Sequence, residues 1–485
     1  MKKARQILLV GLVAALAFFV FAKLPFRDTT ASDESYRLFF DENYKSPGSN
    51  VILISIDTLR ADHLGCYGYR QNTTPNIDEF SKDSVLFKET IAQAPSTTPS
   101  HASIFTSLIP SHHGAFFSMR KPIPQDLVTM AEILRENGYK TISFNGGAQI
   151  AAEFGFDQGF DTYDSWQVKK NQPSITLIDK VDFTIEKVDS AIDWIRTHPN
   201  EKFFLFLHTY EVHHPYTPKK EYLDLFEKHY SGDLPAHISG RLLEKINKGN
   251  LEISKEDEQH IVNTYDAEIY SMDIAFGTLV DFLKKEDLYD SIVVIFTSDH
   301  GEEFREHGWT GWHSHTLYDE LLKVPLMVKF ENSKYGGTVI EEQVRSIDIL
   351  PTLLDILNIA SLECFEGTSL VKRFNSTNRK ELLAVSEQDT VGQRHPATIR
   401  TKRWKLYDRL NDVRLFNLKS DPLEQKDVRK GNKGVCNKLQ DELSYWLSRK
   451  QSVVEAGEAD LDEETLKRLK SLGYIDQNSR SLLCQ

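Results

Sequence analysis

The sequence has few cysteines, and their positions argue against a cysteine-based metal centre. The 485 residues include four cysteines, and they are Cys66, Cys364, Cys436 and Cys484. None of them shows the short spacing that is typical of zinc or iron–sulfur ligands. Cys364 and Cys436 could pair in the C-terminal region, although spacing alone does not establish a disulfide. No internal repeat and no low-complexity tract is visible.

Positive charge is also scarce. The chain has 58 lysines and arginines against 71 aspartates and glutamates, and its formal net charge is −13. Such a balance argues against nucleic acid or an anionic membrane surface as the main partner. An anionic substrate would therefore have to be attracted by a local charge, such as a bound metal ion.

The N-terminus has the pattern of an export signal. Residues 1–5 are basic, and residues 7–22 carry no charge before Lys23. This pattern predicts a signal peptide or a membrane anchor over residues 1–23, followed by a linker over residues 24–48. The rest of the protein is therefore expected to be extracytoplasmic, either periplasmic or secreted. The N-terminal segment would be its only contact with a membrane.

Apolar runs that alternate with helical patterns predict an α/β fold. Buried strands are expected at residues 51–56, 141–144, 203–207, 292–296 and 326–330. Helices are expected at 127–139, 183–194 and 256–284. This alternation predicts a mostly parallel sheet with helices on both faces, in a catalytic domain over residues 49–360. A smaller antiparallel sheet with one packed helix is expected over 361–450. A tail with an exposed helix at 461–472 should occupy 451–485.

Acidic residues and a histidine follow two of the predicted strands directly. Asp57 ends the first strand, and Asp299-His300 ends the strand at 292–296. The carboxyl ends of parallel strands meet at one edge of a sheet, where ligands usually bind. These three residues are therefore candidate metal ligands. For Asp57, a helix N-cap is the alternative interpretation.

Hydroxyl side chains crowd the stretch from Pro95 to Ser107, which leads into a helix. The N-terminus of a helix offers unpaired N–H groups that suit an oxyanion. A Thr or Ser in contact with a metal could act as a nucleophile there. The alternative is a set of ordinary capping hydroxyls. His213 and His214 lie in the loop after the strand at 203–207, on the functional side of the sheet.

Taken together, these motifs resemble the sulfatase family of the alkaline phosphatase superfamily. The resemblance extends from Asn50 to about Val428, and many motifs match in order. The matching stretches include Ile54-Ser-Ile-Asp57, Leu64-Gly-Cys-Tyr-Gly68, Thr98-Pro-Ser-His-Ala-Ser103, His213-His-Pro-Tyr216, Thr297-Ser-Asp-His-Gly-Glu302 and Leu317-Tyr-Asp-Glu320. The resemblance implies an alkaline-phosphatase-like fold and the cleavage of an anionic ester.

Several positions depart from the sulfatase pattern. Thr97 takes the place of the cysteine that becomes formylglycine, and His101 takes the place of the motif's arginine. His300 stands for an asparagine, and His315 for a lysine. The resemblance to family members with a threonine nucleophile implies one metal ion bound by Asp57, Thr97, Asp299 and His300. The histidine ligand favours Mn²⁺, Zn²⁺ or Mg²⁺, with Ca²⁺ expected if the protein behaves as a sulfatase.

The sequence thus predicts a metal-dependent hydrolase of sulfate or phosphate esters in which Thr97 attacks the ester. His213, His313 or His315 would protonate the leaving oxygen or hold the anion. The substrate would be a small-molecule, glycan or lipid ester. Two alternatives remain at this point, a transferase of phospho-head-groups and a non-catalytic binding protein with the sulfatase fold.

Overall fold

The structure is a computed structural model that describes residues 44–165, 180–375, 380–390, 395–410, 412–449, 457–472 and 474. The predicted signal segment over 1–23 and most of the predicted linker over 24–48 lie outside these residues. Within the described part, no helix is both long and apolar enough to cross a membrane.

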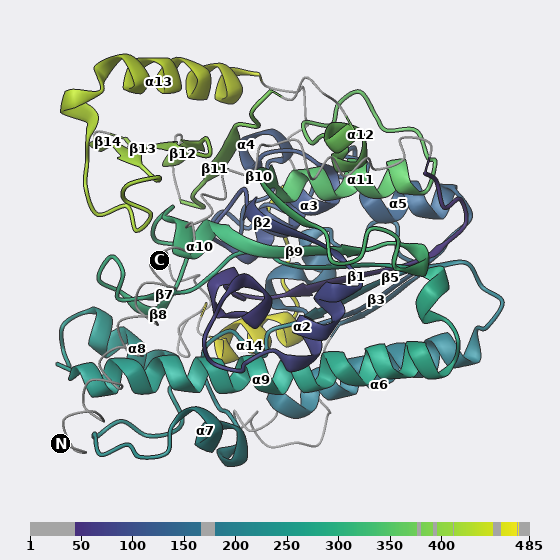
Figure 1. Cartoon of the computed structure of the whole chain (residues 1–485), viewed down its shortest axis with the longest axis horizontal. Helices are drawn as coiled ribbons and strands as arrows, with labels where there is room; N and C mark the ends of the chain where they lie inside the picture. Colours follow the sequence, from purple (N-terminus) through teal and green to yellow (C-terminus); the bar gives the residue numbers. More distant parts are fainter. Residues whose placement is uncertain are drawn as a thin grey trace, which may run out of the picture.

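An eight-stranded mixed sheet forms the centre of the molecule (Figure 1). Its strands lie in the order β10-β2-β9-β6-β1-β5-β3-β4, and only β9 runs antiparallel to its neighbours. The prediction of a mostly parallel sheet is therefore confirmed. The strands are β1 (Asn50–Ile56), β2 (Val85–Ile91), β3 (Lys140–Asn145), β4 (Thr162–Ser165), β5 (Phe203–Thr209), β6 (Ile292–Ser298), β9 (Lys323–Lys329) and β10 (Val339–Arg345).

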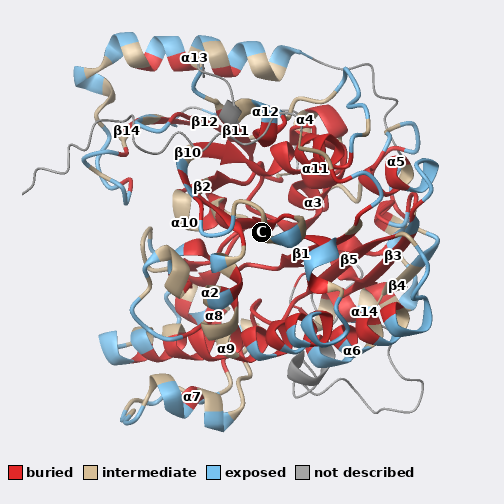
Figure 2. Ribbon diagram, turned by 45° about the vertical axis from the view of Figure 1, so that its right-hand side comes forward, coloured by how far each residue is buried: buried red, intermediate tan, exposed pale blue. Residues whose placement is uncertain are grey.

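Helices cover both faces of this sheet, because its central strands are apolar on both sides. In β1, Val51 and Leu53 point into one core, while Ile52 and Ile54 point into the other. Helices α3 (Thr97–Thr106), α5 (Met130–Glu136) and α11 (Ile349–Ile356) lie above the sheet in Figure 1, and α6 (Lys180–Thr197) and α9 (Lys255–Lys285) lie below it. Helix α2 (Pro75–Lys82) packs against α9. Figure 2 shows that the sheet between these layers is buried.

A second, four-stranded antiparallel sheet follows the large domain, with one helix packed on it, as predicted. It comprises β11 (Ala384–Glu387), β12 (Ala397–Arg400), β13 (Trp404–Arg409) and β14 (Asp412–Asn417), covered by α13 (Lys433–Ser448). Cys436 is buried in its core, and Cys364 is exposed. Both are free thiols, so the suggested disulfide between them is not formed.

The last helix, α14 (Glu463–Ser471), is not exposed as the sequence suggested. Leu469 is fully buried in the larger of the two cores, and Leu472 and Tyr474 join it. The helix packs on the short 3₁₀ helix η3 (Ala148–Ile150), which follows β3. The charged residues of the segment led to the wrong prediction, because its few apolar residues all face one side.

The remaining elements are short, and most of them connect or flank the sheets. They are α4 (Pro110–His113), α7 (Lys220–Phe226), α8 (Gly240–Asn247), α10 (Asp319–Leu322), α12 (Leu370–Asn375) and the hairpin of β7 (Glu303–Phe304) with β8 (Thr310–Trp312).

Candidate active site

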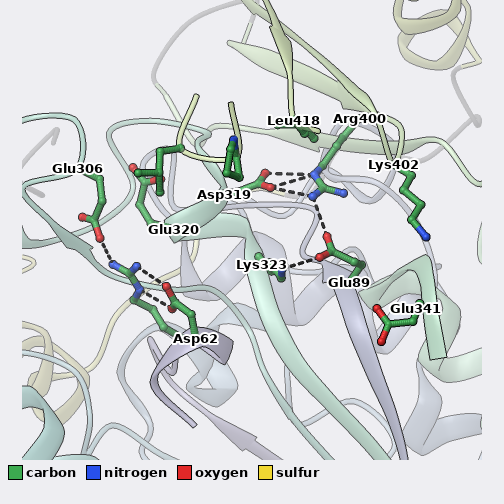
Figure 3. A pocket seen from close by; sticks show the side chains of 13 residues that line it. Asp62, Glu89, Glu306, Asp319, Glu320, Lys323, Glu341, Arg400, Lys402 and Leu418 are labelled. Carbon is green, nitrogen blue, oxygen red and sulfur yellow. Dashed lines mark hydrogen bonds and ion pairs between the residues drawn. The ribbon is translucent and has the colours of Figure 1, made fainter. Parts of the chain in front are cut away.

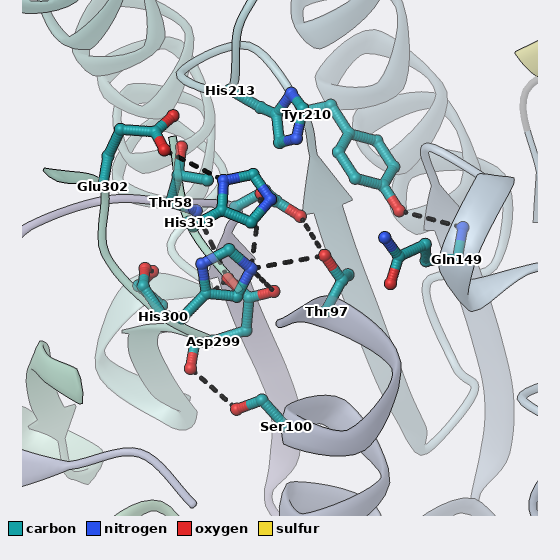
Figure 4. A network of polar contacts seen from close by, with 12 residues as sticks. Thr58, Thr97, Ser100, Gln149, Tyr210, His213, Asp299, His300, Glu302 and His313 are labelled. Atoms are coloured by element: carbon teal, nitrogen blue, oxygen red, sulfur yellow. Dashed lines mark hydrogen bonds and ion pairs between the residues drawn. The ribbon is translucent and has the colours of Figure 1, made fainter. Parts of the chain in front are cut away.

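The ends of two strands and the start of one helix bring the predicted metal ligands and nucleophile together (Figure 4). Asp57 follows β1, Asp299 and His300 follow β6, and Thr97 is the first residue of α3. The hydroxyl of Thr97 donates a hydrogen bond to Asp57 Oδ2 at 3.1 Å, and it lies 3.4 Å from His300 Nε2. The parallel pairing of β1 and β6 fixes this arrangement, because Ile56 pairs directly with Ser298.

The charges and donor atoms of this cluster suit a divalent cation. Asp57, Asp299 and His300 are all buried, and their ligand atoms lie within 4.8 Å of one another. The buried Asp299 Oδ2 accepts no hydrogen bond from the described part of the chain. His300 donates its Nδ1–H to the carbonyl of Gly301 at 2.9 Å, which turns Nε2 toward the carboxylates. A hydrogen bond of this kind is typical of a metal-ligating histidine.

Two further histidines border the cluster, and the sequence did not identify them as functional. His101 Nδ1 lies 3.4 Å from Asp299 Oδ2, and His208 Nε2 lies 3.8 Å from Asp57 Oδ2. Burial lowers the pKa of His101 to about 4 and that of His208 to about 3. Both imidazoles are therefore neutral near pH 7, and the two carboxylates keep an excess of negative charge that a cation would balance.

A second cluster consists of His213, His214 and His313. His313 donates its Nδ1–H to Glu302 at 2.9 Å, so that its Nε2 faces Thr97 and the first cluster (Figure 4). Burial alone would raise the pKa of Glu302, but the imidazoles of His313 and His214 hold it well below its usual value. Glu302 is therefore an ionised carboxylate that orients His313, as in many general acid–base pairs.

His315 is the one predicted catalytic residue that the structure does not bring to these clusters. Its Nε2 lies 2.7 Å from the carboxylate of Glu303, and its ring stacks on Trp309 at 4.7 Å. Two residues apart on an extended strand would share one face, but Ser314 between His313 and His315 has a positive φ of 70°, and this interruption of the extended backbone lets the two side chains diverge. The structure therefore places His213 and His313 beside the first cluster, and His315 against Glu303 and Trp309.

The sequence also missed a contribution from the C-terminal segment. The hydroxyl of Tyr474 lies 2.6 Å from His213 Nε2 and 3.4 Å from His313 Nε2. Arg468 is buried, and its guanidinium lies 5.6 Å from the centre of the Tyr210 ring. No local pattern around residues 468–474 could have indicated contacts with residues more than 150 positions away.

A pocket of about 270 Å³ lies elsewhere, between the large sheet and the C-terminal sheet (Figure 3). Its charged residues pair with one another. Arg60 contacts Asp62 and Glu306, while Arg400 contacts Asp319 and Glu89. The pair of Arg400 with Glu89 links β12 of the C-terminal sheet to β2 of the large sheet, and we assign no reaction to this pocket.

Comparison with known proteins identifies the family. Residues 49–359 match the sulfatase family, and residues 305–452 match the family described as N-sulphoglucosamine sulphohydrolase, C-terminal. The two matches together span the large domain and the small antiparallel sheet.

Individual relatives are distant but extend over most of the chain. An arylsulfatase of Clostridium perfringens is 23% identical over 435 residues, which cover 77% of this chain and 89% of the relative. An N-acetylglucosamine-6-O-sulfatase of Bacteroides thetaiotaomicron is 22% identical over 514 residues, covering 88% of this chain and 90% of the relative. The crystal structure of a phosphonate monoester hydrolase of Agrobacterium radiobacter has a TM-score of 0.68 at 20% identity, covering 82% of this chain and 95% of that one.

Proposed function

The chain belongs to the sulfatase family and is an ester hydrolase, and we propose that it cleaves phosphate or sulfate esters with Thr97 as its nucleophile and one divalent cation as its cofactor. The observation that carries the proposal is the position of the Thr97 hydroxyl, which lies at the N-terminus of α3 between Asp57 and His300. A hydroxyl that served only as a helix cap would bond to the backbone of its own helix.

The side chains around Thr97 have different roles in the proposed reaction. Asp57, Asp299, His300 and the Thr97 oxygen would hold the cation. When bound, such a cation lowers the pKa of a coordinated hydroxyl and neutralises negative charge on the ester. Asp57 Oδ2 already accepts the hydrogen bond of Thr97, so it is placed to receive the proton as Thr97 attacks.

The leaving oxygen requires a proton from the opposite side. His313 is oriented by Glu302, and His213 presents its Nε2 to the same region of the site. In the first step the bond from Thr97 Oγ1 to phosphorus or sulfur forms, and the bond to the leaving oxygen breaks as one of these histidines protonates it. Water then hydrolyses the Thr97 ester and restores the hydroxyl.

A threonine nucleophile favours phosphate over sulfate as the transferred group. A sulfated threonine lacks the hemiacetal route by which a formylglycine adduct decomposes, whereas a phosphothreonine can be hydrolysed with the help of a metal. The name of the Bacteroides relative, an N-acetylglucosamine-6-O-sulfatase, supports a sugar ester as one substrate class. We also infer an extracytoplasmic location from the predicted N-terminal segment.

The test is a set of parallel assays on purified protein with Mn²⁺, Zn²⁺, Mg²⁺ or Ca²⁺ added separately. The substrates are an aryl phosphate, an aryl phosphodiester and an aryl sulfate. We expect phosphoester turnover that falls by about 10⁴-fold or more in Thr97→Ala. Thr97→Ser should retain activity within about tenfold, because it keeps the hydroxyl. Full activity in Thr97→Ala would show that another group is the nucleophile.

A further inference from the structure

The C-terminal segment, residues 457–474, is anchored beside the active site by buried apolar side chains. Leu469 is fully buried, and Leu472 is 1% exposed. The amide of Ala459 donates a hydrogen bond to the carbonyl of Arg120 at 2.7 Å, and Thr465 bonds to Glu153 at 3.1 Å. These anchors are distributed along the segment, so its position relative to the large domain is fixed on both sides of α14.

The end of this segment reaches the proposed reaction site. The phenol oxygen of Tyr474 lies 2.6 Å from His213 Nε2 and 3.4 Å from His313 Nε2, and it also has Thr97 as a hydrogen-bond neighbour. The proposed nucleophile Thr97 and the candidate acids His213 and His313 therefore all lie next to the phenol oxygen of Tyr474. The C-terminal segment therefore faces the proposed reacting groups directly.

Six residues earlier, the segment brings a permanent positive charge to the same side. Arg468 is 5% exposed, and its Nε donates a hydrogen bond to the carbonyl of Gly146 at 3.3 Å. Its guanidinium lies over the ring of Tyr210, and that ring packs edge-on against the imidazole of His208, which borders the metal cluster. Burial lowers the pKa of Arg468 to about 10, because removing the charged guanidinium from water is unfavourable. A bound anion would offset this unfavourable desolvation.

We propose that the C-terminal segment forms one wall of the active site and that Arg468 binds the phosphate or sulfate group of the ester. This inference deepens the proposed function and rests on it. A planar guanidinium suits two oxygens of a tetrahedral anion. Thr97 and the metal cluster would act on the anion from one side, and Arg468 would hold it from the other.

The test compares Arg468→Gln, Arg468→Lys and Arg468→Ala with the control Lys467→Gln. Lys467 is the exposed neighbour on the same helix, so its variant makes the same change of charge without touching the site. Thermal shift with inorganic phosphate, and the phosphate concentration that inhibits turnover by half, are measured for each. We expect Arg468→Gln to weaken phosphate binding and raise KM at least tenfold, with kcat less affected. Added guanidinium should partly restore Arg468→Ala, and Lys467→Gln should match the unchanged protein.

The outcomes separate this inference from the proposed function. If the unchanged protein binds phosphate and Arg468→Gln binds it equally well, the anion-binding role is wrong, whether or not esters are cleaved. If the unchanged protein binds no phosphate, the inference is also overturned. Loss of turnover in Thr97→Ala with phosphate binding intact would support both proposals.

Discussion

Replacing Asp299 by asparagine should stabilise the metal-free protein while weakening its binding of metal. Asp57 and Asp299 are buried carboxylates whose ligand atoms lie within 4.8 Å. Two unit charges at this distance repel each other by about 3.5 kcal/mol at an effective dielectric constant of 20. The side-chain oxygen of asparagine can still accept the hydrogen bonds that Asp299 Oδ1 now accepts from the amides of His300 and Thr58. The hydrogen bonds that the two carboxylates accept reduce the repulsion, so we expect the free energy of unfolding to rise by about 1–3 kcal/mol.

The same substitution removes an anionic ligand. A unit charge and its counterion 4 Å apart attract by about 4 kcal/mol under the same conditions, and a divalent ion in direct contact attracts more strongly. Metal affinity should therefore fall at least about a thousandfold, since 1.4 kcal/mol corresponds to a factor of ten. Metal at a hundred times its Kd stabilises the native protein by about 2.7 kcal/mol, and this gain should vanish in Asp299→Asn.

Differential scanning calorimetry with EDTA, and then with each metal, measures both effects, and elemental analysis gives the metal content. Asp266→Asn is the matched control. Asp266 is equally buried, but its carboxylate pairs with His63 at 2.7 Å. It belongs to neither of the two candidate metal-binding clusters described above. Its variant should keep the metal-induced shift in Tm. The reasoning would be refuted if Asp299→Asn kept this shift, or if it destabilised the metal-free protein by more than about 1 kcal/mol.

Three further predictions concern other buried charges. Glu302→Gln should lower kcat by about ten- to a hundredfold, because His313 loses the carboxylate that orients it, and kinetics at several pH values would reveal this. Lys405→Met should lower the free energy of unfolding in urea by about 3–5 kcal/mol, because the buried Glu424 loses its cation and Asp319 keeps only its ion pair with Arg400. Burial lowers the pKa of Lys329 from 10.5 to about 8. Between pH 8 and 10.5 the amine of Lys329 is neutral in the folded protein but still charged in the unfolded protein. The stability that the neutral amine contributes is therefore fully present above pH 10.5 and lost as the pH falls through 8. The free energy of unfolding should rise between pH 8 and 10.5 by up to about 3 kcal/mol, measured relative to Lys329→Met.

Much of the sheet could be predicted from the sequence because its central strands are buried on both faces. The apolar runs at 51–56, 203–207 and 292–296 correspond to β1, β5 and β6 within one or two residues. The structure also contains β2 and β10, which the sequence analysis missed. In β10, the residues Val339-Ile-Glu-Glu-Gln-Val-Arg345 mix apolar and charged side chains, as is common for an edge strand.

The first cluster was predictable because each of its members follows a strand or begins a helix. A parallel sheet brings the carboxyl ends of its strands to one edge, so topology alone places Asp57 near Asp299. Neither Tyr474 nor Arg468 has such a local signal. Their positions depend on how a short charged helix packs after a long connection, which the order of elements does not determine.

Sequence reasoning placed His313 and His315 together, and the structure explains why only one reaches the site. The two side chains have the same chemistry and are two residues apart, so nothing in the local pattern distinguishes them. The two imidazoles differ in the carboxylate that each of them contacts. Glu302 holds His313 toward Thr97, whereas Glu303 holds His315 against Trp309. Glu302 immediately precedes β7 and Glu303 is its first residue, and their carboxylates contact different imidazoles. The division of roles between His313 and His315 therefore follows from which of these two neighbouring glutamates each imidazole contacts.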